Sequence, residues 1–281
     1  MKTEVSPVRR DLRFNIPRAG INTWHPEGEH VSVFLNTLSM FFPMGERFFI
    51  DSVRHYRDKG AITDEKLLAE VQAFIGQEAM HGREHDDYNE AVAASGLPVD
   101  RQEQFVVRVL KLARQLPPSM QLGATIALEH YTAIMADGLL RDPELIKDAE
   151  PNMKALWNWH AMEETEHKAV AFDVYRTVMG KTPQAYAIRV ITMALATVIF
   201  WSLVYPFFVQ NVYKAGKATD VRGWWTSFQY QFGKIGFMRK LIPAYLDYFK
   251  PGFHPWDHDN SHFLDQMEAL VAEVEHLAAA A

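Results

Sequence analysis

The chain has 281 residues and a formal net charge of −6, and 48% of its residues are hydrophobic. This length is enough for one large helical domain with a substantial core, and the negative charge argues against a general nucleic-acid binder. Because the chain contains no cysteine, disulfides, zinc–thiolate sites, iron–sulfur clusters and thiol nucleophiles are excluded.

Residues 1–28 contain Pro, Arg and Gly without sustained periodicity, and we interpret them as an extended N-terminal arm. The opening stretch MKTEVSPVRRDLRF has no apolar segment of the kind found in a secretory signal. We therefore expect the protein in the cytoplasm, or on the inner face of the membrane.

Residues 29–182 have the pattern of a four-helix bundle, and no Val, Ile or Thr runs bounded by hairpin turns are present, so the predicted fold class is all-α. Pro43 should kink or break the first helix. Thr63–Glu65 is a plausible capping region for the second helix. The expected helices run over about 29–59, 63–95, 101–115, 119–140 and 151–179.

The segment from Val190 to Tyr213 has no charged residue and, at about 24 residues, is long enough to cross a bilayer. Two interpretations stand. The helix packs into the protein, for example at a homodimer interface, or it enters or lies on a membrane surface.

The aromatic and basic segment Trp224–Phe249 suits an interfacial helix or a cap over an apolar pocket. A loop is expected over 251–259 and an amphipathic helix over 260–281. Residues 183–281 are thus predicted to form a strongly apolar helical extension, packed on the bundle or on a membrane.

Two of the expected helices carry a Glu-x-x-His motif. The segment FIGQEAMHGREHDDY contains Glu78 and His81, and the segment WNWHAMEETEHKA contains Glu164 and His167. Residues three positions apart in a helix share a face. A carboxylate and an imidazole one turn apart can therefore reach a common metal ion.

Glu46 and Glu129 lie on the other two bundle helices and complete the order Glu, Glu-x-x-His, Glu, Glu-x-x-His of dinuclear carboxylate sites. Apolar neighbours surround each of them, and buried carboxylates are costly unless a cation compensates them. Oxygen and imidazole donors without sulfur favour iron, with manganese or zinc as alternatives. We predict two metal ions held by Glu46, Glu78, His81, Glu129, Glu164 and His167.

Three further residues are candidates. His160 stands four residues before Glu164 and is added to the predicted metal ligands. His85 occupies the corresponding position on the other helix. It could bind a metal, support a ligand through a hydrogen bond, or face solvent. Helical geometry alone allows Glu163 in place of Glu164, although the Glu-x-x-His precedent favours Glu164. Glu163 and His85 are also candidate catalytic bases.

The motifs GERFF, FIGQEAMHGREH, ALEHYTA and WHAMEETEHKAVAFDVY resemble those of a bacterial ferritin-like family catalogued as predicted metal-dependent hydrolases, over about residues 25 to 250. The resemblance implies a ferritin-like four-helix bundle. The ligand order is also similar to that of di-iron oxygenases. His160, Glu164 and His167 resemble the three-ligand helix of the di-iron arylamine N-oxygenases.

Three functions follow as hypotheses. The first is a di-iron oxidoreductase that activates oxygen to oxidise a hydrophobic or lipid-like substrate, with an electron donor as partner. The alternative is a metal-dependent hydrolase that uses a water bound to the metal. The third is non-catalytic iron handling.

Overall fold

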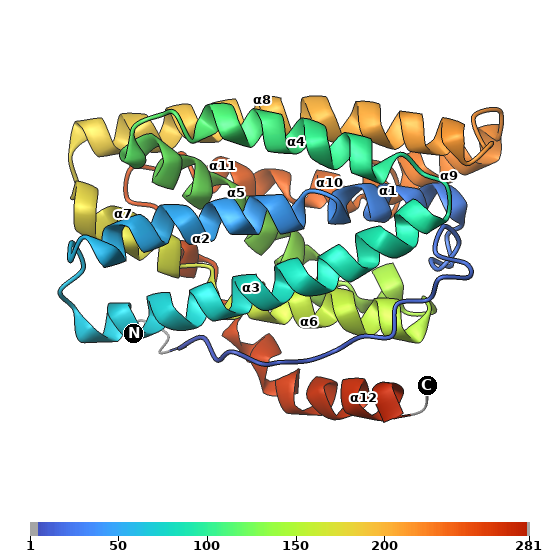
Figure 1. Cartoon of the computed structure of the whole chain (residues 1–281), viewed down its shortest axis with the longest axis horizontal. Coiled ribbons are helices and arrows are strands. Elements are labelled where there is room, and N and C mark those ends of the chain that lie inside the picture. Colours follow the sequence, from blue (N-terminus) through green and yellow to red (C-terminus); the bar gives the residue numbers. More distant parts are fainter. Residues whose placement is uncertain (1–4, 280–281) are drawn as a thin grey trace.

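A computed structural model describes residues 5–279, and every regular element in that range is helical, which confirms the predicted all-α class (Figure 1). The α-helices are α1 (Glu29–Ser39), α2 (Phe42–Asp58), α3 (Glu65–Ala94), α4 (Val99–Ala113), α5 (Pro118–Arg141), α6 (Pro151–His167), α7 (Val170–Met179), α8 (Pro183–Lys214), α9 (Val221–Gln231), α10 (Phe237–Lys240), α11 (Ile242–Asp247) and α12 (Met267–Ala279). Three short 3₁₀ helices are η1 (Pro143–Ile146), η2 (Pro255–Asp257) and η3 (Ser261–Gln266).

The four helices that carry the predicted ligands pack against one another. Helix α2 packs along α3, α5 packs along α6, and α2 also contacts α5 (Figure 1). Their facing sides are filled by large buried side chains such as Phe48, Phe74, Ile126 and Trp159. This packing fixes the relative positions of the four helices and hence of their inward-facing polar groups.

Helix boundaries follow local chemistry, with two departures from the sequence prediction. The side chain of Asp64 accepts a hydrogen bond from the backbone N–H of Leu67 and caps α3, as predicted. The helix break predicted at Pro43 lies just before it, between α1 and α2. Pro43 itself belongs to the first turn of α2, where proline is tolerated. The prediction of one helix over 151–179 was wrong, since the chain breaks between α6 and α7, where the buried ammonium of Lys168 donates to Asn260.

The N-terminal arm runs from residue 5 to residue 28 without a regular helix or strand, and residues 1–4 lie outside the described range. Its apolar side chains, among them Leu12, Phe14, Ile21 and Trp24, are buried against the bundle. The arm passes beside α3 and α12 (Figure 1). It therefore closes one side of the bundle that would otherwise face water.

The C-terminal third begins with α8, which packs along α5 and α1 (Figure 1). The segment 224–249, predicted as an interfacial helix or as a cap over an apolar pocket, is divided among α9, α10 and α11. Gly236 adopts the left-handed conformation at φ 66°, which ends any continuous helix there. The expected loop over 251–259 includes η2, and η3 and α12 replace the single terminal helix, whose residues 280–281 lie outside the described range.

Candidate metal centre

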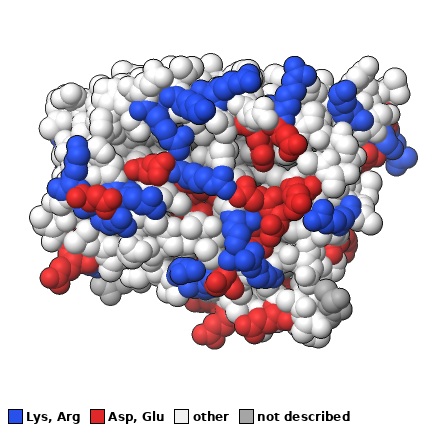
Figure 2. Space-filling model, viewed as in Figure 1, with Lys and Arg blue, Asp and Glu red and all other residues white. Residues whose placement is uncertain are grey.

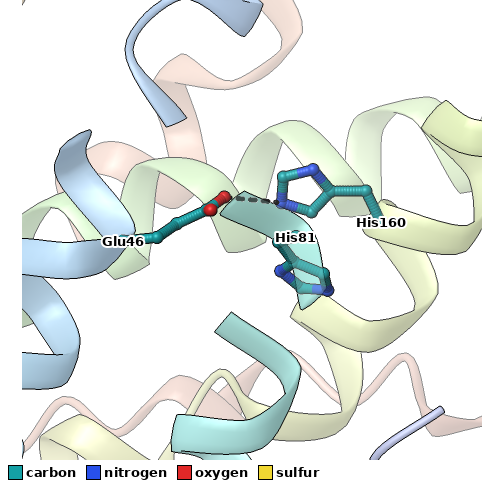
Figure 3. Close-up of side chains that lie close together, drawn as sticks. All are labelled: Glu46, His81 and His160. Carbon is teal, nitrogen blue, oxygen red and sulfur yellow. Dashed lines mark ion pairs between the residues drawn. The ribbon is translucent and has the colours of Figure 1, made fainter. Parts of the chain in front are cut away.

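Polar side chains from the four bundle helices converge in the core. Three overlapping groups have ligand atoms that all lie within 4.8 Å of one another, and every member is buried. The groups are Glu46, His81 and His160; Glu78, His81 and Glu164; and Glu78, Glu129 and His167. Figure 3 shows Glu46 pointing from α2 toward His160 on α6, with the ring of His81 beside them. The seven residues predicted from the sequence as ligands are thus brought together, and they can hold metal ions.

A glycine on α3 makes room for Glu46. A Cβ atom at Gly82 would lie 3.2 Å from Oε2 of Glu46, which is closer than most real contacts of such an atom. The missing side chain therefore lets the carboxylate of α2 approach the backbone of α3, one turn beyond Glu78.

Several polar atoms in this cluster have no hydrogen-bond partner among the described residues. They include both carboxylate oxygens of Glu46 and Glu129 and Oε2 of Glu78. Nδ1 of His81 lacks a hydrogen bond as well, whereas Nε2 of His167 lies 3.0 Å from Oε1 of Glu78. Because nearly all buried polar groups in proteins have partners, this concentration of unpaired acceptor atoms fits bound cations.

The outer nitrogen of two of the histidines is held by a neighbour. Nε2 of His81 lies 3.1 Å from Oε2 of Glu163, and Nδ1 of His167 lies 3.0 Å from Oε1 of Gln77. Each ring therefore turns its other nitrogen toward the cluster. Metal-binding histidines usually have such an outer partner, which fixes the tautomer and the orientation of the ring.

His160 follows the same scheme with a histidine as its outer partner. Its Nε2 lies 2.9 Å from Oε1 of Glu164 and 3.8 Å from Oε1 of Glu46. Its Nδ1 lies 2.7 Å from Nε2 of His85. The other ring nitrogen of His85 lies 2.9 Å from the hydroxyl of Ser39, so His85 stands one step outside the cluster.

The side-chain polar atoms of Glu163 and His85 all contact other side chains of the protein. One carboxylate oxygen of Glu163 accepts a hydrogen bond from Arg10, and the other faces His81. Both ring nitrogens of His85 are engaged as well. We infer that the two residues orient ligands; that either acts as a general base stays a prediction.

Sequence reasoning missed an outer network that starts in the N-terminal arm. Arg10 bridges Glu163 and Glu166, with its Nη2 2.7 Å from Oε1 of Glu166. The amide of Gln77 donates to Oε2 of Glu166 at 2.8 Å and so links the arm to His167. The only signal in the sequence was that Glu163 and Glu166 flank ligands on one helix. Nothing in the arm marked Arg10.

The electrostatics of the cluster favour a bound cation. Burial, followed by the charges of the neighbouring glutamates, raises the pKa of Glu46 and of Glu129 well above the usual range. Burial also raises the pKa of Glu78 to about 7. Carboxyl groups in this position ionise readily only when positive charge lies beside them.

Two cavities with mostly apolar walls adjoin the cluster. The larger, which we call the α4/α8 cavity, has a volume of about 1130 Å³ including its open mouth, and Glu46 lies in its wall. The smaller has a volume of about 550 Å³, and His160 and Glu164 lie in its wall. Four residues line both cavities, namely Leu38, Phe42, Thr132 and Met135. An apolar molecule in either cavity would meet the polar cluster at one end.

The all-α fold and the buried glutamate and histidine cluster define a helical protein able to hold metal ions. A model of the family described as predicted metal-dependent hydrolases matches residues 8–259. This match covers most of the chain, so the chain belongs to that family. No curated protein and no solved structure matches the chain.

Proposed function

We propose that the chain is a metal-dependent hydrolase that cleaves an apolar ester at the buried cluster. The observation that carries the proposal is that Glu46 belongs both to the cluster and to the wall of the α4/α8 cavity. The family description supports hydrolysis. The apolar walls support a substrate with a long hydrocarbon part, because such walls bind ligands mainly by removing apolar surface from water.

The donor set fits divalent cations. Carboxylate oxygens and imidazole nitrogens without sulfur suit iron, manganese and zinc, and the ligand order favours two ions, with iron as our first choice. When bound, such cations polarise an ester carbonyl and lower the pKa of a water molecule. The residues that would hold them are Glu46, Glu78, His81, Glu129, His160, Glu164 and His167.

The outer hydrogen bonds keep the donors in place. Glu163 holds His81 and Gln77 holds His167, so a ring that rotated would lose its outer partner. Donors fixed in this way need little reorganisation when a cation binds. The chain thus supplies a preorganised ligand set.

Glu46 is the best-placed group to accept a proton from the attacking water, through the carboxylate oxygen that does not hold a cation. Its two carboxylate oxygens have no hydrogen-bond partner among the described residues, and it lies where the α4/α8 cavity meets the cluster. As the water adds to the ester carbonyl, its proton passes to Glu46 and then to the leaving alkoxide, which releases an acid and an alcohol. Phe42, Phe48 and Phe49 line the same cavity and restrict access of other water.

The test is the cleavage of p-nitrophenyl esters of rising acyl length by protein loaded with iron, manganese or zinc. We expect turnover that requires metal and increases with acyl length. The variant Glu46→Gln should lose on the order of 100-fold in kcat. The matched variant Glu90→Gln, changed at an exposed position of α3, should keep wild-type rates. Absence of ester cleavage with all three metals would overturn the proposal.

Oxidation of an apolar substrate by dioxygen is a second candidate. The observation that favours it is the ligand set, which has the order of the di-iron carboxylate bundles and includes His160 as an added imidazole. Such a reaction would need a reductant, supplied by an electron-donor partner. Dioxygen uptake by the reduced, iron-loaded protein without any ester cleavage would favour oxidation over hydrolysis.

A further inference from the structure

The outer surface of α8 is apolar over most of its length. Only 22% of its most apolar 18-residue window is buried, and it is the only helix in the described chain that is long and apolar enough to cross a membrane. Val198 is 69% exposed and Tyr213 is 68% exposed. We define the apolar face by the exposed side chains Ile191, Leu195, Val198, Ile199, Val209 and Tyr213 of α8, Leu112 of α4 and Leu116 just after it, Trp225 and Phe228 of α9 and Phe232 just after it, and Ile242 and Leu246 of α11.

The apolar face extends onto the elements that adjoin α8. On one side, α4 and α8 together line the α4/α8 cavity. On the other side, the ring of Phe232, just after α9, lies 6.4 Å from the ring of Tyr205 on α8. The hydroxyl of Tyr245 on α11 lies 3.1 Å from the hydroxyl of Thr197 on α8. Contiguous exposed apolar surface of this extent marks an interaction site in soluble proteins.

The segment that carries most of the apolar face is strongly basic, although the chain as a whole is acidic. Between Lys181 and Leu246 the only acidic residue is Asp220. The exposed basic residues of this segment are Lys181, Lys214, Lys217, Arg222, Lys234, Arg239 and Lys240, whereas Arg189 is buried. The C-terminal half of α4 adds Arg108 and Lys111, and Arg114 follows it. Figure 2 shows a mostly uncharged upper edge, where α8 runs in Figure 1, bordered by Lys and Arg side chains along α4.

The apolar face and the cations beside it together indicate a lipid bilayer as the partner. Exposed aromatic and aliphatic side chains rimmed by cations suit the interface of a bilayer with anionic headgroups. A second copy of the chain fits less well, because a two-fold interface places the same patch against itself. Cations such as Arg108 and Lys111 would then face cations.

Buried polar contacts keep α8 on the bundle. The amide of Asn211 donates to the hydroxyl of Thr37 at 3.0 Å and accepts from Gln102 at 2.9 Å. The guanidinium of Arg189 donates to the backbone oxygens of Tyr248 and Lys250, each at 2.7 Å. A helix that crossed the bilayer alone would lose these partners in an apolar medium, at a cost of several kcal/mol for each unsatisfied group.

We propose that the apolar face lies on the surface of an anionic lipid bilayer, and that an apolar substrate passes from the lipid through the α4/α8 cavity to Glu46. The cavity is lined by Leu195, Ile199 and Leu116, which also belong to the face, so its mouth opens where the lipid would be. The entry route rests on the proposed function, whereas lipid binding does not.

The test is sedimentation of the full-length protein with vesicles of phosphatidylcholine alone or with 30% phosphatidylglycerol. We expect binding to the anionic vesicles. The variant Val198→Asp should weaken this binding on the order of tenfold. It removes an apolar side chain that the bilayer would cover, and it adds a negative charge that the anionic headgroups repel. The matched control is Ala272→Asp, an exposed position on α12, which lies at the opposite edge of the molecule (Figure 1). It should bind within about twofold of wild type.

Val198 does not line the α4/α8 cavity, so Val198→Asp should keep its metal content and its cleavage of a soluble short-chain ester. It should lose cleavage of a long-chain ester presented in anionic vesicles. Wild-type protein that stays in the supernatant would overturn the inference, and so would a soluble dimer that Val198→Asp converts to monomers. If the protein does not hydrolyse esters, it should still bind the vesicles, and neither ester should be cleaved.

Discussion

Seven polar side chains lie buried at the centre of the bundle, whereas a row of large apolar side chains lies exposed along α8. Folding in water disfavours both arrangements, since buried polar atoms lose their hydration and exposed apolar atoms keep theirs. Each is stabilised once its missing partner is supplied. Cations would satisfy Glu46, Glu78 and Glu129, and lipid would cover Val198 and its neighbours.

The two regions also differ in how firmly the fold holds them. The cluster is surrounded by outer hydrogen bonds from Glu163, Gln77 and His85. The apolar face has no such support, because nothing in the described chain covers it. The first region is therefore built for a ligand of fixed geometry, and the second for a fluid surface. If this contrast holds, variants of the cluster should lose metal, and variants of the apolar face should lose only vesicle binding.

Removing a ligand should give the largest effect. We expect Glu78→Ala and Glu164→Ala to lose most of their metal, to below about a tenth of the wild-type content, because the remaining side chains no longer balance the charge of the cations. Elemental analysis after native purification is the measurement. Glu90→Ala, on the exposed side of α3, is the matched control and should bind as wild type. Full metal content in both ligand variants would show that the cluster does not hold the metal.

Removing an outer support should give an intermediate effect. Arg10 holds Glu163 and Glu166, so Arg10→Gln should weaken metal affinity by roughly 10- to 100-fold while the ligands stay in place. Competition with a chromophoric chelator measures this affinity. Arg9→Gln changes the neighbouring, exposed arginine and should have little effect. Equal losses in the two variants would show that Arg10 acts only through the charge of the arm.

Charge removal at the apolar face should give a smaller effect. The double variant Arg108→Gln and Lys111→Gln keeps the apolar side chains but removes two exposed cations of α4. Each cation near an anionic surface contributes about 1 kcal/mol. We therefore expect vesicle binding to weaken by roughly 10- to 30-fold at low salt, with metal content unchanged, and by less at high salt. The measurement is vesicle sedimentation at two ionic strengths, and a salt-independent loss would contradict the role of charge.

His25 should show the smallest effect, because it is a buried polar residue whose partners are all supplied by the chain. Its Nε2 lies 2.8 Å from the backbone oxygen of Leu145, and its Nδ1 accepts from the backbone N–H of Glu27. Burial lowers the pKa of His25 from 6.5 to about 4. The unfolded chain therefore binds a proton between these pH values that the folded chain does not. The stability due to neutral His25 is complete above pH 6.5 and is lost as the pH falls toward 4.

The matching measurement is the free energy of unfolding by urea between pH 7 and pH 4. His25→Leu should be less stable at pH 7, but its stability should fall less steeply, by up to about 1.4 kcal/mol per pH unit. His276→Leu, at an exposed position of α12, should keep the wild-type slope. An unchanged slope in His25→Leu would show that His25 takes up its proton over the same pH range in the folded and the unfolded protein.

Much of the fold and of the cluster could be predicted because both depend on local periodicity. The spacing of Glu78 with His81, and of Glu164 with His167, is set by a single turn of helix, so sequence separation alone indicated a shared face. The capping of α3 by Asp64 was predictable for the same reason.

The outer network could not be predicted because it depends on contacts between distant segments. Arg10 reaches Glu166 across a separation of 156 residues, and no local pattern marks an arginine in an arm as a partner of a bundle helix. The partners of Glu163 and His85 were unpredictable for the same reason. Helical spacing indicated that they lie near the ligands but not which atoms they face.

The most direct test of the central claim is the metal content of wild-type protein purified without chelators and, in parallel, refilled with iron, manganese or zinc. The cluster of Glu46, Glu78, His81, Glu129, His160, Glu164 and His167 predicts about two tightly held ions per chain. Protein that keeps less than about a tenth of an ion per chain after refilling with each metal would contradict the claim, because ligand sets of this kind bind all three.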